Sequence, residues 1–154
     1  MDEIIIRSAT KEDLNTLLQF EQGIVEAERP FDPTLASGVI HYYDLEALID
    51  SPEAEVVVAE LSNKVIASGY ARIEKSKNYL AHSHHAYLGF MYVLPKHRGK
   101  GVNKKIIDAL KDWSKKKQIN EIRLEVYHEN ESAIRAYQKL GFTPNLVEMR
   151  MNLE

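Results

Sequence analysis

Residues 93–103 have the sequence VLPKHRGKGVN, in which an apolar strand runs into a basic turn and then into an amphipathic helix. Gly99 and Gly101 let backbone N–H groups gather around an anion, because glycine tolerates conformations that other residues avoid. The new helix adds its positive end and unpaired N–H donors, and Arg98 and Lys100 add positive charge. A glycine in such a turn can also serve only to reverse the chain. The stretch as a whole favours a site for a phosphorylated ligand.

The size and composition of the chain bound its organisation. Its 154 residues, 44% of them hydrophobic, are enough for one core and too few for two ordinary domains, so we expect a single domain over residues 1–154. A net charge of -3 argues against a nucleic-acid partner. The absence of cysteine excludes disulfides, thiolate metal sites and a cysteine nucleophile. Because the sequence shows no signal peptide and no membrane span, we expect a cytoplasmic protein without a membrane partner.

Hydrophobic periodicity and turn residues predict alternating helices and strands. The helix after residue 102 has the clearest pattern, because its apolar and charged residues separate onto two faces. The expected elements are a strand at 4–7, a helix opened by Thr10, a short helix at 43–49, a hairpin of strands from 55 to 73, a strand at 85–93, a helix from 102, a strand at 122–127, a helix from Asn130 to Gly141 and a last strand at 146–151.

A second segment, residues 130–142, has the sequence NESAIRAYQKLGF. Together with Arg98-x-x-Gly101-x-Asn103, it resembles the GCN5-related N-acetyltransferase (GNAT) family. The patterns of that family are N-x-x-A-x-x-x-Y-x-x-x-G-F and a pyrophosphate motif of Gln or Arg, two residues, Gly, one residue and then Gly or Ala. Asn103 departs from the small final residue of that motif, so its side chain must point away from the pyrophosphate or hydrogen-bond to it. The expected element order also matches the family.

The resemblance implies an α/β (α+β) fold with a mixed, mostly antiparallel central sheet of about six to seven strands, flanked by about four helices. It implies acetyl-CoA as the co-substrate and no metal. In this family the strand before the phosphate turn splays from its neighbour, and its unpaired backbone groups bind the pantetheine arm. The residues that the resemblance places on the cofactor are Met91, Tyr92, Val93, Arg98, Gly99, Lys100, Gly101, Val102, Asn103 and Asn130.

Acetyl transfer from a thioester to an amine requires a neutral amine, stabilisation of an oxyanion and a proton for the departing thiolate. For the oxyanion, the resemblance points to a backbone N–H near Tyr92 or Val93. For the thiolate, it points to Tyr137 as the general acid, since a phenol of pKa about 10 can donate to a thiolate whose acid has a pKa of about 8.5. From spacing alone, Tyr137 would instead pack with Ala133 and Leu140 on the apolar stripe of its helix.

The acceptor site has fewer signals in the sequence. Glu21 falls on the apolar stripe of the first helix, and Glu28 and Asp32 flank a proline-broken loop, where carboxylates can hold a cationic amine. Tyr87 stands roughly where some family members carry a catalytic glutamate, and the nearby His85 titrates near neutral pH. Each of these five residues can also be an ordinary surface residue, and the sequence assigns no general base.

The leading hypothesis is therefore an N-acetyltransferase that transfers the acetyl group of acetyl-CoA to a primary amine by direct attack. The acceptor is a small-molecule amine or a peptide N-terminus, and relatives of this kind suggest a homodimer. A non-catalytic acyl-CoA-binding or regulatory module is the alternative. A third reading is an interaction protein whose basic helix, residues 102–118, docks an acidic partner.

Overall fold

The computed structural model describes residues 3–154. They divide into two units, one that ends at Leu124 and one that comprises Glu125–Glu154, and each unit is described by itself. In the described residues no helix is both long and apolar enough to cross a membrane.

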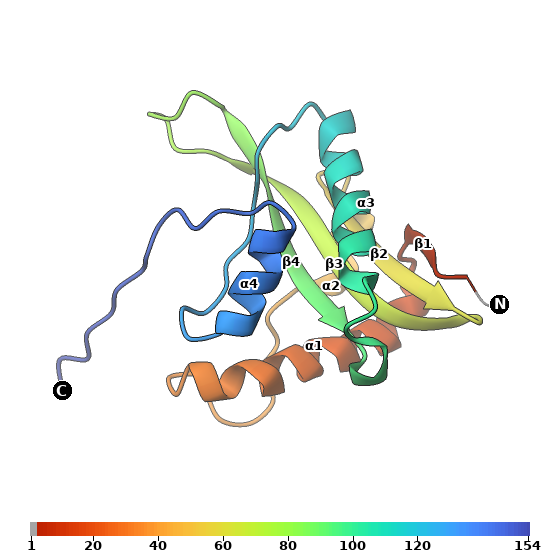
Figure 1. Cartoon of the computed structure of the whole chain (residues 1–154), viewed down its shortest axis with the longest axis horizontal. Coiled ribbons are helices and arrows are strands. Elements are labelled where there is room, and N and C mark those ends of the chain that lie inside the picture. The colour runs from red at the N-terminus through yellow and green to blue at the C-terminus, as the bar shows by residue number, and fades with distance from the viewer. Residues whose placement is uncertain (1–2) are drawn as a thin grey trace. The chain divides into compact units, whose positions relative to one another are not determined.

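The first unit is built on one mixed sheet, which Figure 1 shows with its helices. Antiparallel pairing joins the first four strands in sequence order, and the fifth lies parallel to the fourth. The strands are β1 (Ile5–Ser8), β2 (Ala54–Leu61), β3 (Lys64–Lys75), β4 (His84–Val93) and β5 (Ile122–Arg123). This arrangement confirms the predicted fold class, although the described residues form five strands and not six or seven.

Three α-helices belong to the first unit and one to the second. They are α1 (Leu14–Glu28), α2 (Leu45–Asp50), α3 (Val102–Lys116) and, in the second unit, α4 (Glu131–Lys139). Short 3-10 turns, η1 (Lys11–Asp13) and η2 (Arg29–Phe31), flank α1. The predicted start at Thr10 is confirmed, because Thr10 N donates to Asp13 Oδ2 over 2.8 Å in a capping box.

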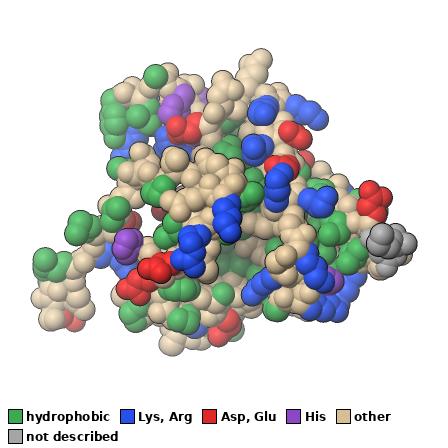
Figure 2. Space-filling model, viewed as in Figure 1, with side chains coloured by type: hydrophobic (Ala, Val, Ile, Leu, Met, Phe, Trp, Pro, Cys, Tyr) green, Lys and Arg blue, Asp and Glu red, His purple; other side chains and the backbone are tan. Residues whose placement is uncertain are grey.

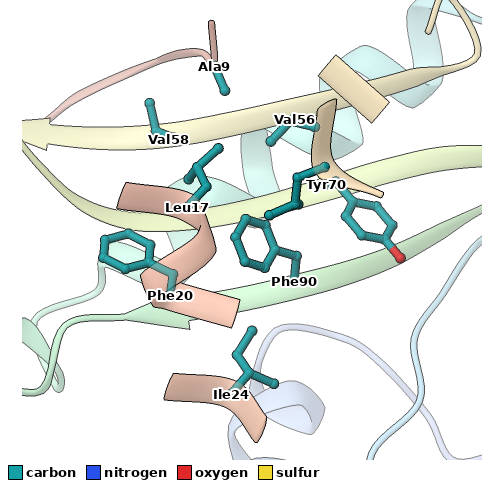
Figure 3. Packing of buried hydrophobic residues seen from close by; sticks show 9 residues of the cluster. Ala9, Leu17, Phe20, Ile24, Val56, Val58, Tyr70 and Phe90 are labelled. Atoms are coloured by element: carbon teal, nitrogen blue, oxygen red, sulfur yellow. The ribbon is translucent and has the colours of Figure 1, made fainter. Parts of the chain in front are cut away.

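The sheet buries apolar side chains on both faces. Figure 3 shows residues of α1 beside residues of the strands on one face: Leu17, Phe20 and Ile24 from the helix, with Val56, Val58, Tyr70 and Phe90 from the sheet. The opposite face meets α3, because a Cβ atom placed on Gly69 would lie 2.6 Å from Ile106 Cγ2. Successive strand residues point to opposite faces of a sheet. Gly69 therefore faces α3, and Tyr70 lies on the face that packs against α1. The apolar stripe of α3 is therefore buried, as its periodicity predicts.

Two predicted strands differ from the structure. The strand expected at 122–127 ends at Arg123, and the strand expected at 146–151 does not form. In the second case the side chains are exposed, from 71% at Val147 to 90% at Leu146. The alternation of apolar and polar residues favours a strand, but a strand also needs a neighbour whose backbone pairs with it, and alternation does not supply one.

Candidate functional site

The turn before α3 has the backbone of an anion cradle. It follows β4 and the 3-10 turn η3 (Pro95–His97), and it holds Gly99 at φ +76° and Gly101 at φ +79°. A Cβ atom on either glycine would meet nothing within 4 Å, so glycine is required for the left-handed backbone and not for space. Left-handed residues in a turn are typical of backbone nests, in which successive N–H groups can surround an anion.

The N-terminus of α3 lies at this turn and can bind the same anion. Gly101 is its N-cap and contributes no side-chain bond, and the first turn contains no acidic residue. The first helical bond runs from Lys105 N to Gly101 O, over 3.4 Å. The N–H groups of residues 102–104 precede it and have no partner inside the helix. A bound phosphate would satisfy these donors and would face the positive end of the helix.

Arg98 is fixed at the end of β4. Its Nε donates to the Val93 carbonyl over 2.7 Å, and its guanidinium lies 5.4 Å from the centroid of the Tyr92 ring. The Tyr92 ring is held in turn by α1, where it lies 4.9 Å from the Phe20 ring and fills the space that a Cβ atom on Gly23 would need. The Arg98 guanidinium therefore lies beside the turn. Among the described residues, no carboxylate forms an ion pair with it.

Lysine side chains add a positive field around this turn. Figure 2 shows several Lys and Arg side chains over α3 and the turn before it. Lys100 and Lys105 are exposed, and Lys104 pairs with Asp108 over 2.8 Å. Desolvation and then the charges of Lys100, Lys96 and Lys64 lower the pKa of His97. The turn is thus electrostatically suited to a polyanionic ligand.

Asn103 departs from the family motif, and its side chain has an unused acceptor. Among the described residues, its buried Oδ1 has no hydrogen-bond partner. This oxygen accepts hydrogen bonds and is buried, so it is not suited to contact the acceptor oxygens of a pyrophosphate. Of the two orientations that the sequence allows, this burial favours an Asn103 oxygen directed away from the pyrophosphate.

A β-bulge interrupts β4 just before the turn. Ser68 pairs with Tyr92 and Tyr70 pairs with Gly89, so two residues of β4, Phe90 and Met91, stand opposite one residue of β3. Phe90 has a φ of +60°, which is unusual for a bulky residue. The buried Ser68 hydroxyl donates to the Phe90 carbonyl over 3.0 Å and holds the bulge.

The pairing of β4 with β5 is very short. It covers only Ala86 with Ile122 and Tyr87 with Arg123, so β5 pairs with no residue of β4 from 88 to 93. The separation of the two strands near residues 91–93 stays a prediction from the family resemblance. A bulge such as this one bends its strand and disrupts the ladder locally.

Replacing Ser68 by alanine should lower the free energy of unfolding by about 1–3 kcal/mol, because the buried Phe90 carbonyl loses its donor. Urea denaturation measures the change. Ser114→Ala is the matched control: this serine is equally buried and its hydroxyl donates to Leu110 O over 2.8 Å, but it lies within the regular ladder of α3. Equal losses in the two variants would contradict a special role for Ser68 in the bulge.

The structure places Glu21 away from any ligand. It is fully buried, and its Oε2 accepts hydrogen bonds from Tyr42 N over 2.8 Å and from Tyr43 N over 2.9 Å. Its Oε1 lies 2.8 Å from His41 Nδ1. The carboxylate predicted to hold an amine instead fixes residues 41–43 against α1. The position of Glu21 on the apolar stripe was the sequence signal for this burial.

Glu28 and Asp32 lie at the end of α1 and just beyond it. Burial raises the pKa of Glu28, and the charge of the Asp32 carboxylate raises it further. Asp32 is buried and accepts a hydrogen bond from Thr34 N over 2.9 Å, so it orders the loop after η2. Of the three predicted acids, Glu28 combines partial exposure with a perturbed environment.

His85 and Tyr87 belong to a polar row on the face of the sheet that carries Tyr70. On this face Arg72 pairs with Tyr87 and Glu74 pairs with His85 across the two strands. The Arg72 guanidinium lies 5.0 Å from the centroid of the Tyr87 ring, and Arg72 Nε donates to Glu74 Oε2. Sequence reasoning missed Arg72, because the register of two strands is not legible in one sequence.

The buried His85 has a polar group near each ring nitrogen. Its Nδ1 lies 2.8 Å from the Ser76 hydroxyl, and its Nε2 lies 3.6 Å from Glu74 Oε1. Desolvation and then the charge of Arg123 lower the pKa of His85. The lowered pKa favours the neutral imidazole, whose Nδ1 shares a hydrogen bond with the Ser76 hydroxyl. No group of three or more His, Cys, Asp or Glu side chains that could hold a metal occurs in residues 3–154.

The second unit presents the predicted tyrosine on α4. Asn130 caps this helix, since its Oδ1 accepts a hydrogen bond from Ala133 N over 3.3 Å, and Gly141 ends it at φ +106°. Tyr137 is half-buried, and its ring meets Phe142 edge to face with the centroids 5.8 Å apart. The local structure of the helix therefore agrees with the predicted cap and terminator.

Comparison with known proteins places these features in a family. The model of the Acetyltransferase (GNAT) family matches residues 17–142. An uncharacterized N-acetyltransferase of Bacillus subtilis (strain 168), YobR, is 37% identical over 57 residues. That alignment covers 37% of this chain and 23% of YobR.

Several solved structures have the same fold. A tetramutant of the BH1408 protein from Bacillus halodurans superposes with a TM-score of 0.83 at 22% identity, covering 97% of this chain and 99% of that one. A predicted acetyltransferase with acetyl-CoA from Clostridium acetobutylicum gives 0.75 at 19% identity, covering 98% and 97%. Aminoglycoside 6'-N-acetyltransferase AAC(6')-IG from Acinetobacter haemolyticus gives 0.74 at 22% identity, covering 97% and 99%. The family model covers most of the sequence, and the chain belongs to the GNAT family of acetyltransferases.

Proposed function

We propose that this chain is an acetyl-CoA-dependent N-acetyltransferase that acts on a primary amine, with residues 1–154 working as one domain. The observation that carries the proposal is the turn at Gly99 and Gly101, which opens onto the uncapped start of α3 directly after the bulge of β4. A similar fold holds acetyl-CoA in the Clostridium acetobutylicum structure, and a similar fold belongs to an aminoglycoside acetyltransferase.

In this proposal the backbone N–H groups of residues 99–103 bind the pyrophosphate, and Arg98 and Lys100 add charge. Val102 and Asn103 contribute through their backbone N–H groups. The backbone of Met91, Tyr92 and Val93, on the edge of β4 that does not pair with β3, binds the pantetheine arm, since β5 pairs with β4 only at Ala86 and Tyr87. Asn130 is assigned to the pantetheine by family resemblance.

The reaction is a direct displacement. The amine nitrogen forms a bond to the thioester carbon, the carbon–sulfur bond breaks, and the sulfur leaves as a thiolate. A backbone N–H near Tyr92 or Val93 stabilises the oxyanion, and Tyr137 gives its hydroxyl proton to the thiolate. The nitrogen carries an extra proton after the attack and releases it to water as the amide forms, and the phenolate recovers a proton from water. No covalent intermediate with the protein is required.

Calorimetric titration tests the cofactor site. Acetyl-CoA should bind, and an analogue truncated to acetyl-pantetheine should bind at least about tenfold more weakly, because it lacks the group that the turn is built to hold. Binding of acetyl-CoA without turnover of any amine would favour the alternative, a non-catalytic acyl-CoA-binding module. Failure of wild-type protein to bind acetyl-CoA would overturn the proposal.

The substitution Gly101→Ala should weaken acetyl-CoA binding about tenfold, because a left-handed residue with a Cβ atom costs about 1–2 kcal/mol and the turn relaxes away from its cradle shape. Gly38→Ala is the matched control. Gly38 also has a positive φ, +83°, and an open Cβ position, but it lies in the loop after η2. Both variants should lose stability, and only Gly101→Ala should lose affinity; a Gly101→Ala protein with wild-type affinity would contradict the assignment.

A further inference from the structure

The sheet places two arginines on either side of one tyrosine. Arg72 of β3 pairs with Tyr87 of β4 in the antiparallel ladder, and Arg123 of β5 pairs with Tyr87 in the parallel ladder. Residues that pair in this way carry their side chains on the same face of the sheet. Neighbouring strands lie about 4.8 Å apart, so the backbones of the two arginines are about 10 Å apart. We call Arg72, Tyr87 and Arg123 the arginine rung.

A carboxylate two residues away on the same strand orients each guanidinium. Arg72 Nε donates to Glu74 Oε2, and Arg123 Nε donates to Glu121 Oε2 over 2.6 Å. The Arg72 guanidinium also lies 5.0 Å from the centroid of the Tyr87 ring, which restricts its movement further. Both carboxylates bind the inner nitrogen of their arginine, so each guanidinium is held in place with its two outer nitrogens, Nη1 and Nη2, available to other groups.

The outer nitrogens of the arginine rung have capacity for a ligand. Arg72 Nη1 makes one long hydrogen bond to the Tyr70 hydroxyl, 3.4 Å, and Arg123 Nη2 lies 3.1 Å from His82 Nε2. Among the described residues, Arg72 Nη2 and Arg123 Nη1 have no hydrogen-bond or ion-pair partner. The two arginine side chains are 43% and 38% exposed, so a ligand can reach them. Such a preorganised guanidinium fork matches the geometry of a carboxylate or a phosphate.

The arginine rung lies between the acids of this face and the bulge of β4. On the side of the bulge, Tyr70 pairs with Gly89, and a Cβ atom on Gly89 would lie 2.6 Å from Tyr70 Cζ. On the other side, Glu74 pairs with His85. A strand rises about 3.3 Å per residue, so the rung is about 13 Å from residue 91, where the proposed pantetheine site begins. A ligand that extends along this face from residues 91–93 therefore meets the arginines before it meets Glu74.

We propose that the arginine rung binds an oxyanion on the acceptor, so that the enzyme prefers primary amines that also carry a carboxylate or a phosphate. This inference rests on the proposed function, because the amine must reach a thioester held beside residues 91–93. The distance from there to the rung favours acceptors whose anion is several bonds away from the amine. Arg72 and Arg123 set the specificity and take no part in bond breaking, while Glu74 and Glu121 are positioning residues.

The first test measures binding and needs no acetyl-CoA. Its probes are 6-aminohexanoate and the matched neutral molecule 6-aminohexanamide. In the wild type, 6-aminohexanoate should shift the backbone NMR signals of β3 and β4 around the arginine rung, and 6-aminohexanamide should not. Arg72→Gln and Arg123→Gln should each raise the Kd for 6-aminohexanoate at least about fivefold, and Arg72→Lys, which keeps the charge without the fork, by less than Arg72→Gln.

The control for these variants is Lys11→Gln, which removes a cation from an exposed ion pair with Asp50, 3.1 Å long, and should leave the Kd unchanged. Equal shifts with the two probes in the wild type would overturn the proposal. So would a Kd for 6-aminohexanoate that is the same in the wild type, Arg72→Gln and Arg123→Gln.

The second test measures turnover with acetyl-CoA. In the wild type, kcat/KM should be at least about tenfold higher for 6-aminohexanoate than for 6-aminohexanamide. Arg72→Gln should bring this ratio close to 1, mainly through a higher KM for 6-aminohexanoate. A variant that is merely misfolded loses both activities and keeps the ratio. 6-Aminohexyl phosphate is a third acceptor, and the anion with the higher kcat/KM is the one that the rung fits better.

The two tests separate this inference from the proposed function. A wild-type ratio near 1 for both anionic acceptors would overturn the role of the arginine rung and leave the proposed function standing. A wild type that neither binds acetyl-CoA nor acetylates any of the three amines would overturn the proposed function. The binding test would then still decide whether the rung holds an oxyanion.

Discussion

Replacing Tyr137 by phenylalanine should lower kcat about 100-fold or more, because the departing thiolate loses its proton donor. The affinity for acetyl-CoA should stay the same, since the change removes one hydroxyl and keeps the ring that packs against Phe142. Turnover can be followed by the free thiol of released CoA. The chain contains no cysteine, so a thiol reagent detects the product without a protein background.

The control for this substitution is Tyr79→Phe, which removes a hydroxyl from a tyrosine that is 80% exposed in the first unit. Its kcat should equal that of the wild type. A general acid also shapes the basic limb of the pH–rate profile, which should change in Tyr137→Phe alone. Identical kcat and identical profiles for Tyr137→Phe and the wild type would show that Tyr137 only packs on its helix.

Replacing Glu21 by alanine should lower the free energy of unfolding by about 3–5 kcal/mol, the largest stability effect that we expect from a single side chain here. The substitution leaves the N–H groups of Tyr42 and Tyr43 without their acceptor and removes the carboxylate beside His41. It also leaves a cavity under residues 41–43. In thermal melts the change corresponds to a fall in Tm of about 10 °C.

Two further variants separate the causes of this loss. Glu21→Gln keeps one carbonyl acceptor for the two N–H groups and should recover part of the stability. Glu26→Ala removes an exposed carboxylate from the same helix and should change the free energy of unfolding by less than about 1 kcal/mol. If Glu21→Ala unfolds no more easily than Glu26→Ala, the buried bonds do not hold residues 41–43.

The features that the sequence predicts correctly are those that depend on neighbouring residues. The turn at Gly99 and Gly101, the amphipathic α3 and the cap of α4 by Asn130 are all local, because each depends on a few consecutive residues. Their physical reasons, left-handed backbone, helical periodicity and a side-chain acceptor, act within one or two turns of chain. The family match over residues 17–142 includes these segments.

The features that it does not predict depend on residues far apart in the chain. The bulge at Phe90 is defined by its register with β3, and the partners of Glu21 lie 20 to 22 residues away. The row of Arg72 and Tyr87 likewise needs two strands in a known alignment. The strand expected at 146–151 is wrong for the same reason. Its residues alternate as those of a strand do, but a strand also needs a partner strand, which the segment itself cannot provide.

The C-terminal segment has a practical consequence. Val147, Met149, Met151 and Leu153 are all more than 70% exposed on a chain that carries no strand after α4 in the part that the structure describes. Regular apolar alternation with unpaired backbone groups is the pattern through which protein molecules associate edge to edge and precipitate. We therefore expect charged substitutions among these exposed apolar residues to reduce the tendency of the protein to associate in concentrated solution.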